Sequence, residues 1–350
     1  MDNKLLEKII DLTLYTGTYG RKKCTCSCIG CTQENFGRKH EDFQGTLEQI
    51  DVIIKKLPNL KNVYFLGNPD ISVDTEFCNI AAKKVIEYGK KVMFSTSGYN
   101  ATTVLKKLLD GIAPENIEYI SYSVDTLNIE KLRYLKGNKD ISLEEIEKAI
   151  MFCNENGITV KIQPTLWEIN QDDYRDIIKH FHDKFNIDWF TFHAGSFESL
   201  QDRNVPLKHI KPEKWRTISK DINNISKEKK LKIVVPKIFL NEKEYKEYKK
   251  NTGLYCSNGG TGMQIWLQKD GIKATFCPLL AEIMPNKIIF DIKSEEPKLF
   301  KSNNECPVCG KCIDIDIRKQ SVNEMGREFL KENEKIYNVC RYYSYREDYR

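Results

Sequence analysis

The 350-residue sequence lacks any apolar run long enough to cross a bilayer and has almost no excess of either charge. A membrane-spanning helix needs about 20 consecutive apolar residues, and the N-terminus Met-Asp-Asn-Lys-Leu-Leu-Glu-Lys is too charged for a secretory signal. We therefore expect a cytoplasmic protein with no membrane partner. The 55 basic and 50 acidic residues form no concentrated basic stripe, which argues against nucleic-acid binding. Internal repeats and low-complexity segments are absent as well.

Cysteine, in contrast, is plentiful and unevenly distributed. Four of the 12 cysteines lie within residues 24–31 and six within residues 256–340. In a cytoplasmic chain such clusters favour metal or redox chemistry over disulfides. The two isolated cysteines, Cys78 and Cys153, stand in helix-like segments, and we expect them to be buried core thiols.

From the N-terminus to about residue 193, β-like runs alternate with helix-like runs. The predicted strands, rich in Val, Ile, Tyr and Phe, are Ile9–Tyr15, Asn62–Leu66, Lys91–Ser95, Ile117–Val124, Gly157–Pro164 and Ile187–His193. The predicted helices, with apolar residues at helical spacing, are Leu47–Leu57, Asp74–Tyr88, Ala101–Leu109, Ser142–Asn156 and Asp172–Phe185. This alternation predicts a parallel, curved sheet.

The predicted fold is α/β: a partial (β/α)6 TIM-like barrel followed by a small cysteine-rich domain. The barrel takes residues 1–196, a bridging segment residues 197–251, and the cysteine-rich unit residues 252–350. The bridge contains two predicted helices and a short strand over 231–235. In the last unit, Asp270-Gly271 between two β-like runs predicts a β-hairpin.

The most informative motif is the C-x3-C-x2-C array of Cys24, Cys28 and Cys31, just after the first predicted strand. Three thiolates can hold three irons of a [4Fe–4S] cube and leave the fourth iron open, because full ligation takes four cysteines. Zinc is the alternative, since Cys26 also lies in this run and zinc prefers a closed tetrahedral site. Active sites of such barrels lie at the C-terminal ends of the strands, which is where this array falls.

The cysteines of the tail leave the same two possibilities open, zinc or an iron–sulfur cluster. Cys306, Cys309, Cys312 and Cys340 suit either a four-thiolate zinc site or a ferredoxin-like [4Fe–4S] cluster. Cys256 and Cys277 bracket the predicted hairpin. We expect at least one auxiliary [4Fe–4S] cluster, with one and two clusters both left open.

With these elements in place, the chain resembles the radical S-adenosylmethionine (SAM) superfamily, with a SPASM or twitch-type auxiliary-cluster tail. The resemblance covers residues 9–193 and about 252–340. It implies that Cys24, Cys28 and Cys31 hold a [4Fe–4S] cluster whose open iron binds SAM. It further implies reductive cleavage of SAM to a 5′-deoxyadenosyl radical, which abstracts hydrogen from a substrate. An external electron donor such as flavodoxin or ferredoxin is then expected.

The resemblance also carries cofactor-binding residues onto the strand ends. Leu66-Gly67-Asn68-Pro69 resembles the family's Gly-Gly-Glu-Pro turn, with Asn68 in place of the acid. Ser95-Thr96-Ser97-Gly98 resembles a Thr-Asn-Gly turn, and Ser123-Val124-Asp125 a Ser-x-Asp motif near the SAM ribose. The cofactor-binding set so implied is Ile29, Gly67, Asn68, Pro69, Ser95, Ser123, Asp125, Gln163 and His193.

Catalytic side chains are harder to assign. Asp125, Gln163 and His193 are the candidates, although Ser-x-Asp can simply cap a helix and a lone His on an apolar strand is commonly a core residue. The family usually carries an aromatic residue before its third cysteine, in contact with adenine, whereas this chain has Gly30 there. We expect Ile29 or Phe36 to take over that packing.

The expected substrate is a ribosomally made peptide that is crosslinked or epimerised. The alternatives are a sugar or aminocyclitol dehydrogenase or epimerase, a maturase or activase of a protein partner, and a non-enzymatic, zinc-stabilised interaction protein. The first predicted strand begins at Ile9, so we expect no leader-binding domain ahead of the barrel. The bridge, the tail or another protein would then bind the peptide.

Overall fold

The computed structural model describes residues 5–15, 24–31, 45–66, 70–195, 207–236, 239–244, 261–269, 271–276 and 289–297, and the backbone of residues 337 and 338. Its central feature is a ten-stranded sheet with strand order β13-β12-β11-β1-β2-β3-β4-β5-β7-β9. From β11 to β9, each strand is parallel to the next one in this order. The predicted parallel, barrel-like α/β architecture is confirmed.

The sheet is built from strands close to those predicted. The parallel strands are β11 (Gly262–Gln268), β1 (Asp11–Tyr15), β2 (Asn62–Leu66), β3 (Lys91–Thr96), β4 (Ile117–Tyr122), β5 (Val160–Ile162), β7 (Trp189–Thr191) and β9 (Lys232–Val234). Two antiparallel strands, β12 (Gly271–Thr275) and β13 (Phe290–Asp291), complete one edge. Small separate pairs are β6 (Thr165–Leu166) with β8 (His193–Ala194), and β10 (Phe239–Leu240) with β14 (Tyr337–Asn338).

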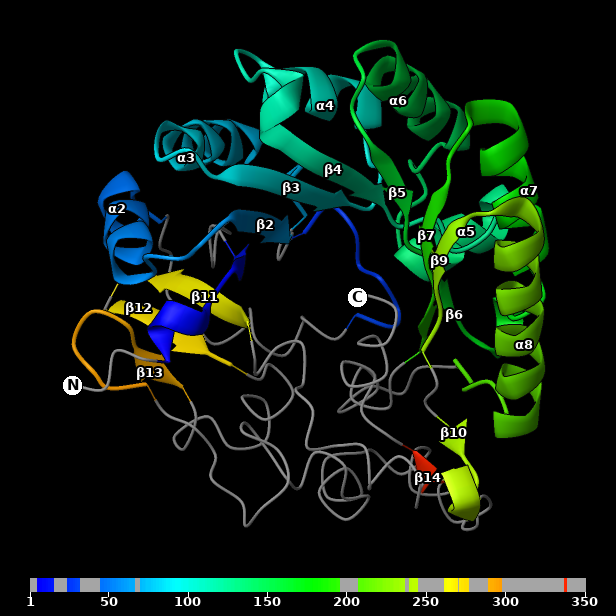
Figure 1. The fold of residues 1–350 in the computed structure, drawn as a ribbon. Helices are drawn as coiled ribbons and strands as arrows, with labels where there is room; N and C mark the ends of the chain where they lie inside the picture. The colour runs from blue at the N-terminus through cyan, green and yellow to red at the C-terminus, as the bar shows by residue number, and fades with distance from the viewer. Residues whose placement is uncertain are drawn as a thin grey trace.

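Helices cover the convex side of this curved sheet (Figure 1). They are α2 (Leu47–Lys56), α3 (Thr75–Glu87), α4 (Ala101–Leu109), α6 (Leu143–Glu155), α7 (Tyr174–Phe185) and α8 (Pro212–Lys229). A further helix, α5 (Ile129–Lys136), was not predicted, and three 3₁₀ turns are η1 (Leu6–Lys8), η2 (Pro114–Asn116) and η3 (Glu168–Asn170). The Ser142 side chain accepts a hydrogen bond from Glu145 N, which caps α6 as its sequence pattern indicates.

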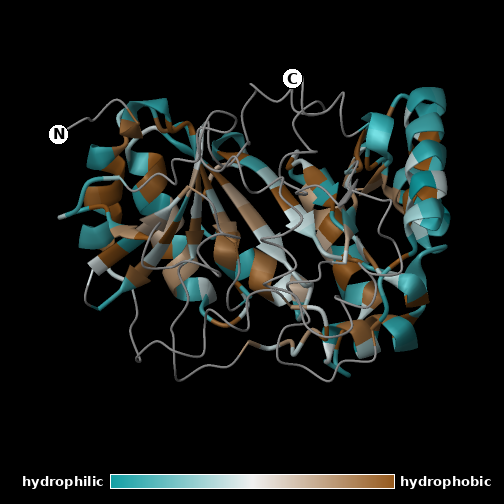
Figure 2. Ribbon diagram, turned by 90° about the horizontal axis from the view of Figure 1, so that it is seen from below, coloured by the Kyte–Doolittle hydropathy of each residue, from teal (hydrophilic) through white to brown (hydrophobic). Residues whose placement is uncertain are grey.

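Alternation along the strands divides the side chains between two layers. Phe65, Phe94 and Phe190 are completely buried in the core that the sheet shares with the helices. Residues of opposite parity, such as Tyr64 and Lys161, point to the other, concave face. In Figure 2 the ribbon of the peripheral helices carries many residues coloured as hydrophilic. Of the helices described, none is long and apolar enough to span a bilayer.

The predicted hairpin is present and extends the barrel sheet. β11 and β12 are antiparallel, and Gln268 pairs with Gly271 across the turn. β11 also pairs in parallel with β1, residue by residue from Asp11–Gly262 to Tyr15–Trp266. At the opposite edge, β9 of the predicted bridge adds in parallel to β7. The division of the chain at residue 252 stays a prediction, but this hairpin is an integral part of the sheet.

Candidate active site

The cysteine array lies in the segment 24–31 that follows β1, and α5 holds it from one side. Ile29 N donates a hydrogen bond to Leu135 O (3.0 Å), and Asn138 Nδ2 donates to Thr25 O (2.7 Å). Between these contacts, α5 ends at Lys136 and is capped by Gly137, which has φ +56°. A Cβ on Gly137 would lie 2.2 Å from Ser27 O. A side chain there would therefore separate α5 from the cysteine segment.

Asp70 holds the segment from the other side. Its backbone N–H lies 3.4 Å from Cys24 Sγ, in hydrogen-bonding geometry. Its carboxylate accepts hydrogen bonds from Thr96 Oγ1 (3.1 Å), Ser97 N (2.6 Å) and Ser72 N (2.9 Å). Asp70 is 7% exposed, so these bonds replace the water that a carboxylate needs. The ends of β2 and β3 are thereby tied to the first cysteine.

The four thiols of this segment differ in their surroundings. Cys24, Cys26, Cys28 and Cys31 form no disulfides. Burial raises the pKa of Cys24 despite the Asp70 N–H. Cys28 and Cys26 share a hydrogen bond, which raises the pKa of Cys28 and lowers that of Cys26, to which Ser97 also contributes. Cys31 and Lys136 are both close enough to Cys28 for their charges to act on its pKa.

The donor chemistry of this segment fits an iron–sulfur cluster with an open iron. Three thiols at the expected spacing follow β1 in the chain and lie beside the ends of β2 and β3, and the charge of a buried cation acts to lower the pKa of Cys28 against the burial that raises it. Among the residues described, no three His, Cys, Asp or Glu side chains gather closely enough to hold a metal ion. A cube needs no such gathering, because each thiolate binds a different iron.

The cation is Lys136, the last residue of α5. Its Nζ lies 2.8 Å from Asp125 Oδ2 and donates to Ser123 Oγ at 2.7 Å. Burial lowers the pKa of Lys136, but the negative charges of Asp125 and Cys28 outweigh burial and raise it overall. Lys136 therefore carries its charge at neutral pH, in a position 4% exposed.

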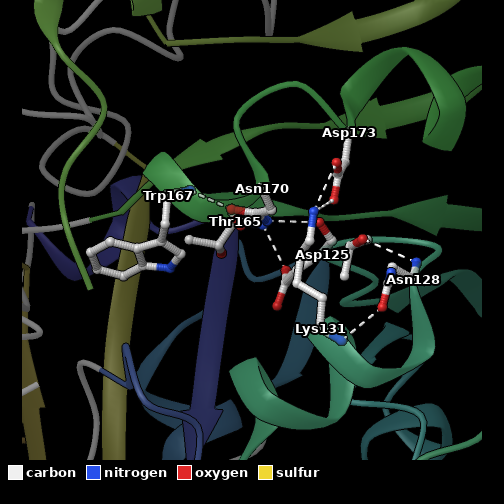
Figure 3. A network of polar contacts seen from close by, with 8 residues as sticks. Asp125, Asn128, Lys131, Thr165, Trp167, Asn170 and Asp173 are labelled. Carbon is white, nitrogen blue, oxygen red and sulfur yellow. Dashed lines mark hydrogen bonds and ion pairs between the residues drawn. The ribbon is translucent and has the colours of Figure 1, made fainter. Parts of the chain in front are cut away.

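Asp125 is the centre of a wider network of buried polar contacts (Figure 3). Its Oδ1 accepts a hydrogen bond from Thr165 N (2.7 Å), and its carbonyl accepts one from Asn170 Nδ2 (2.7 Å). Asn170 in turn accepts from Trp167 N and donates to Thr165 O. Both carboxylate oxygens of Asp125 are thus occupied by protein groups, which favours a positioning role over contact with a substrate.

The other candidates lie at strand ends, where the barrel geometry predicts. Ser123 N donates to Thr96 O (3.0 Å), and Ser95 lies in register with Ser121 at the end of β3. Gln163 Oε1 accepts from Tyr64 OH, which also contacts Ser121 Oγ (3.1 Å each). His193, half-buried, begins β8 opposite Thr165, whose N–H bonds to Asp125.

Several predicted site residues fall outside the described part of the chain. These are Gly67, Asn68 and Pro69, Phe36, and the tail cysteines Cys256, Cys277, Cys306, Cys309, Cys312 and Cys340. Their roles stay predictions. Ile29 is described, and its side chain packs with Leu135, Trp167 and Leu207.

Three residues that the sequence did not single out are central here: Asp70, Lys136 and Trp167. Asp70 directly follows Gly67-Asn68-Pro69, the turn in which Asn68 replaces the family's acidic residue. An acidic side chain this close to the turn was therefore a signal in the sequence for a role at the site. Lys136 and Gly137 form a Lys-Gly helix end, which indicates a C-cap. Trp167 had no local signal, because its role depends on contacts with residues far away in the sequence.

Comparison with known proteins agrees with this geometry. Residues 21–181 match the family model described as "Radical SAM superfamily". No curated protein is detectably similar to the chain in sequence. Among solved structures, SuiB of Streptococcus suis bound to precursor peptide SuiA superposes with a TM-score of 0.61 at 15% identity, over 84% of this chain and 64% of that one. SuiB bound to S-adenosylmethionine gives a TM-score of 0.58, also at 15% identity, over 84% of this chain and 63% of SuiB.

A second similar structure matches over almost its whole length. Native anSMEcpe with bound AdoMet and Kp18Cys peptide superposes with a TM-score of 0.56 at 13% identity, covering 97% of this chain and 96% of that one. At such identities the similarity establishes the fold. This chain spans just under two thirds of SuiB, so the length of the two proteins differs substantially.

Proposed function

Because residues 21–181 form a domain of the radical SAM superfamily, we propose that this protein cleaves SAM reductively and uses the resulting radical to abstract hydrogen from a peptide. The observation that carries the proposal is the C-x3-C-x2-C segment, which follows β1 in the chain and is tied to the ends of β2, β3 and α5. Cys24, Cys28 and Cys31 would hold the cluster. When bound, the cluster supplies the electron that breaks a carbon–sulfur bond of SAM.

The protein's own residues would bind and orient the cofactor. The carboxylate of SAM needs a cation, and Lys136 is a buried one beside the cysteines. Its ammonium has three N–H donors, of which Asp125 and Ser123 take two. One donor is left for the SAM carboxylate. Asp125 would keep the ammonium charged and oriented toward that carboxylate.

A peptide is the substrate that the comparisons favour. The SuiB structure contains its precursor peptide SuiA, and the anSMEcpe structure contains the Kp18Cys peptide. Crosslinking or epimerisation of a ribosomally made peptide would be the outcome. A short precursor gene beside this one would support the peptide, whereas sugar-pathway genes would favour a small-molecule substrate and a large protein partner gene a maturase.

The test is incubation of the anaerobically reconstituted, dithionite-reduced protein with SAM, with 5′-deoxyadenosine measured by mass spectrometry. Cys28→Ala should abolish product, because the cluster loses one of its three ligands. Cys153→Ala is the matched control, since Cys153 is buried in the helical core and completely unexposed. Wild-type rates in Cys28→Ala, or zinc in place of iron, would refute the proposal.

The tail cysteines Cys256, Cys277, Cys306, Cys309, Cys312 and Cys340 would hold at least one auxiliary [4Fe–4S] cluster. Each cube contains four irons, so the reconstituted protein should carry about eight or more irons per chain. Cys309→Ala should lower that count by about four while leaving SAM cleavage in place. An iron count of about four in the wild type would exclude the auxiliary cluster.

A further inference from the structure

The residue before the third cysteine is Gly30, and the space beside it is filled by Trp167, which directly follows β6. A Cβ built on Gly30 would lie 2.3 Å from Cζ2 and 2.9 Å from Cε2 of Trp167. Non-bonded carbons settle at about 3.5–4.0 Å, so position 30 cannot carry a side chain while the indole is there. Gly30 does not have a positive φ, so space and not backbone conformation requires the glycine.

A second glycine closes on the same indole. A Cβ on Gly195 would lie 2.3 Å from Cε3 and 2.5 Å from Cδ2 of Trp167. Gly195 follows β8, and its N–H donates to Leu166 O at 2.8 Å, next to Trp167 in the chain. The indole, only 3% exposed, thus lies in close contact with the cysteine segment and with the end of β8.

The backbone of Trp167 is fixed as well. Trp167 N donates to Asn170 Oδ1 (2.7 Å), and Asn170 Nδ2 donates to Asp125 O (2.7 Å). In Figure 3 the indole projects away from this network. Leu135 on α5 and Ile29 pack in the same apolar cluster. Contacts therefore run from Asp125, through Trp167, to the residue before Cys31.

We propose that Trp167 is the positioning residue of the third cysteine: its indole takes the volume that a side chain at position 30 would occupy, and so sets where Cys31 meets the cluster. The inference rests on the proposed function, in which Cys31 is a cluster ligand. Positions 30 and 167 then compete for one space, which the large side chain of Trp167 fills because Gly30 has no side chain. Enlarging one should be tolerated only when the other is reduced.

The test is a double-mutant cycle of Gly30→Phe and Trp167→Ala on the full-length, anaerobically reconstituted protein. The readouts are iron per chain, the dissociation constant of SAM, and the change that SAM causes in the electron paramagnetic resonance spectrum of the reduced cluster. Gly30→Phe should weaken SAM binding at least tenfold and abolish the spectral change. The double variant should recover to within about threefold of the wild type, with the spectral change restored.

Trp215→Ala is the control for general loss of packing, because Trp215 is 1% exposed and donates to Pro236 O instead of contacting the cysteine segment. It should lower the melting temperature while keeping the spectral change. If Gly30→Phe does not fold, Gly30→Ala and the double variant Gly30→Ala/Trp167→Phe provide the same comparison. Gly30→Ala should weaken SAM binding less than Gly30→Phe, and the double variant should again restore it.

The proposal is overturned if Gly30→Phe binds iron and SAM as the wild type does, or if the double variant is no better than the worse single variant. Failure of the proposed function would look different. A wild type that never releases 5′-deoxyadenosine would contradict SAM cleavage, while rescue of iron content in the double variant would still establish the positioning role.

Discussion

Lys136 Nζ lies 2.8 Å from Asp125 Oδ2, with the two side chains only 5% and 9% exposed. The ion pair joins the end of α5 to the loop after β4, and its cation acts on the thiol of Cys28. Asp125 therefore belongs to the framework of the site: one carboxylate oxygen binds Lys136 and the other binds Thr165 N.

Removing the charge of one member of this ion pair should lower the free energy of unfolding. Asp125→Asn leaves the Lys136 ammonium buried without its counter-charge, for which a loss of about 3–5 kcal/mol in unfolding free energy is typical. Urea unfolding of the purified chain measures it. Asp140→Asn makes the same chemical change at an exposed position and should shift stability by less than about 0.5 kcal/mol. Equal stability of the two variants would contradict the assignment.

Replacing Asp70 should also lower the free energy of unfolding, here through the loss of hydrogen bonds. Asp70→Asn replaces one carboxylate oxygen with an NH₂ group, which cannot accept from Ser97 N or Thr96 Oγ1. A buried N–H left without an acceptor costs about 1–3 kcal/mol. We expect that loss in urea unfolding, together with lower iron retention, because Asp70 N contacts Cys24. Iron content equal to that of Asp140→Asn would rule out the link to the cysteine segment.

Lys161 predicts a pH dependence of stability. It is 2% exposed on β5, its Nζ lies 4.2 Å from the ring centre of Tyr119, and no carboxylate among the described residues pairs with it. Burial, with repulsion from Lys232, lowers its pKa to about 7. The unfolded chain, with a pKa near 10.4, holds this proton more tightly.

The sign of the effect follows from linkage. Between about pH 7 and 10 the unfolded state binds more protons at Lys161, so its contribution to stability rises with pH over this window. Below pH 7 Lys161 is charged in the folded state, and burying that charge lowers the free energy of unfolding by on the order of 5 kcal/mol for a pKa shift of this size. Lys161→Met should thus be more stable than the wild type at pH 6, and the difference should shrink towards pH 10.

Unfolding free energies at pH 6, 8 and 10 measure this change. Lys227→Met, at an exposed position on α8, is the control and should show no such trend. If Lys161→Met and the wild type differ by the same amount at all three pH values, Lys161 is charged throughout and the shifted pKa is wrong.

Cys153 should be chemically inert in the folded protein. It is completely buried on α6, and burial raises the pKa of its thiol to about 12, despite a hydrogen bond with Tyr122. Alkylation by iodoacetamide needs the thiolate and access to it. At pH 8 the folded chain should leave Cys153 unlabelled for hours, whereas chain unfolded in guanidinium should label within minutes. Peptide mass spectrometry locates the label, and rapid labelling of folded protein would show that this thiol is accessible.

The local parts of the fold could be predicted closely. β2 and α4 begin and end at the predicted residues, and the Asp270-Gly271 turn marked the hairpin. The buried positions of Cys78 and Cys153 were also predicted, and both are confirmed. α5 was missed because its eight residues are strongly charged, with Glu130, Lys131 and Arg133 among them, so its apolar spacing was weak. Its end nevertheless proved to hold the cysteine segment.

Sequence by itself determined the alternation of strands and helices, the spacing of Cys24, Cys28 and Cys31, and their place after the first strand, because each depends on neighbouring residues. Tertiary structure alone decided that β11 pairs with β1, that Asp70 and Lys136 flank the cysteines, and that Trp167 fills the space beside Gly30. These contacts join residues far apart in the chain. They are selected by packing, buried charge and hydrogen-bond satisfaction in the assembled fold, which leave no periodic trace in the local sequence.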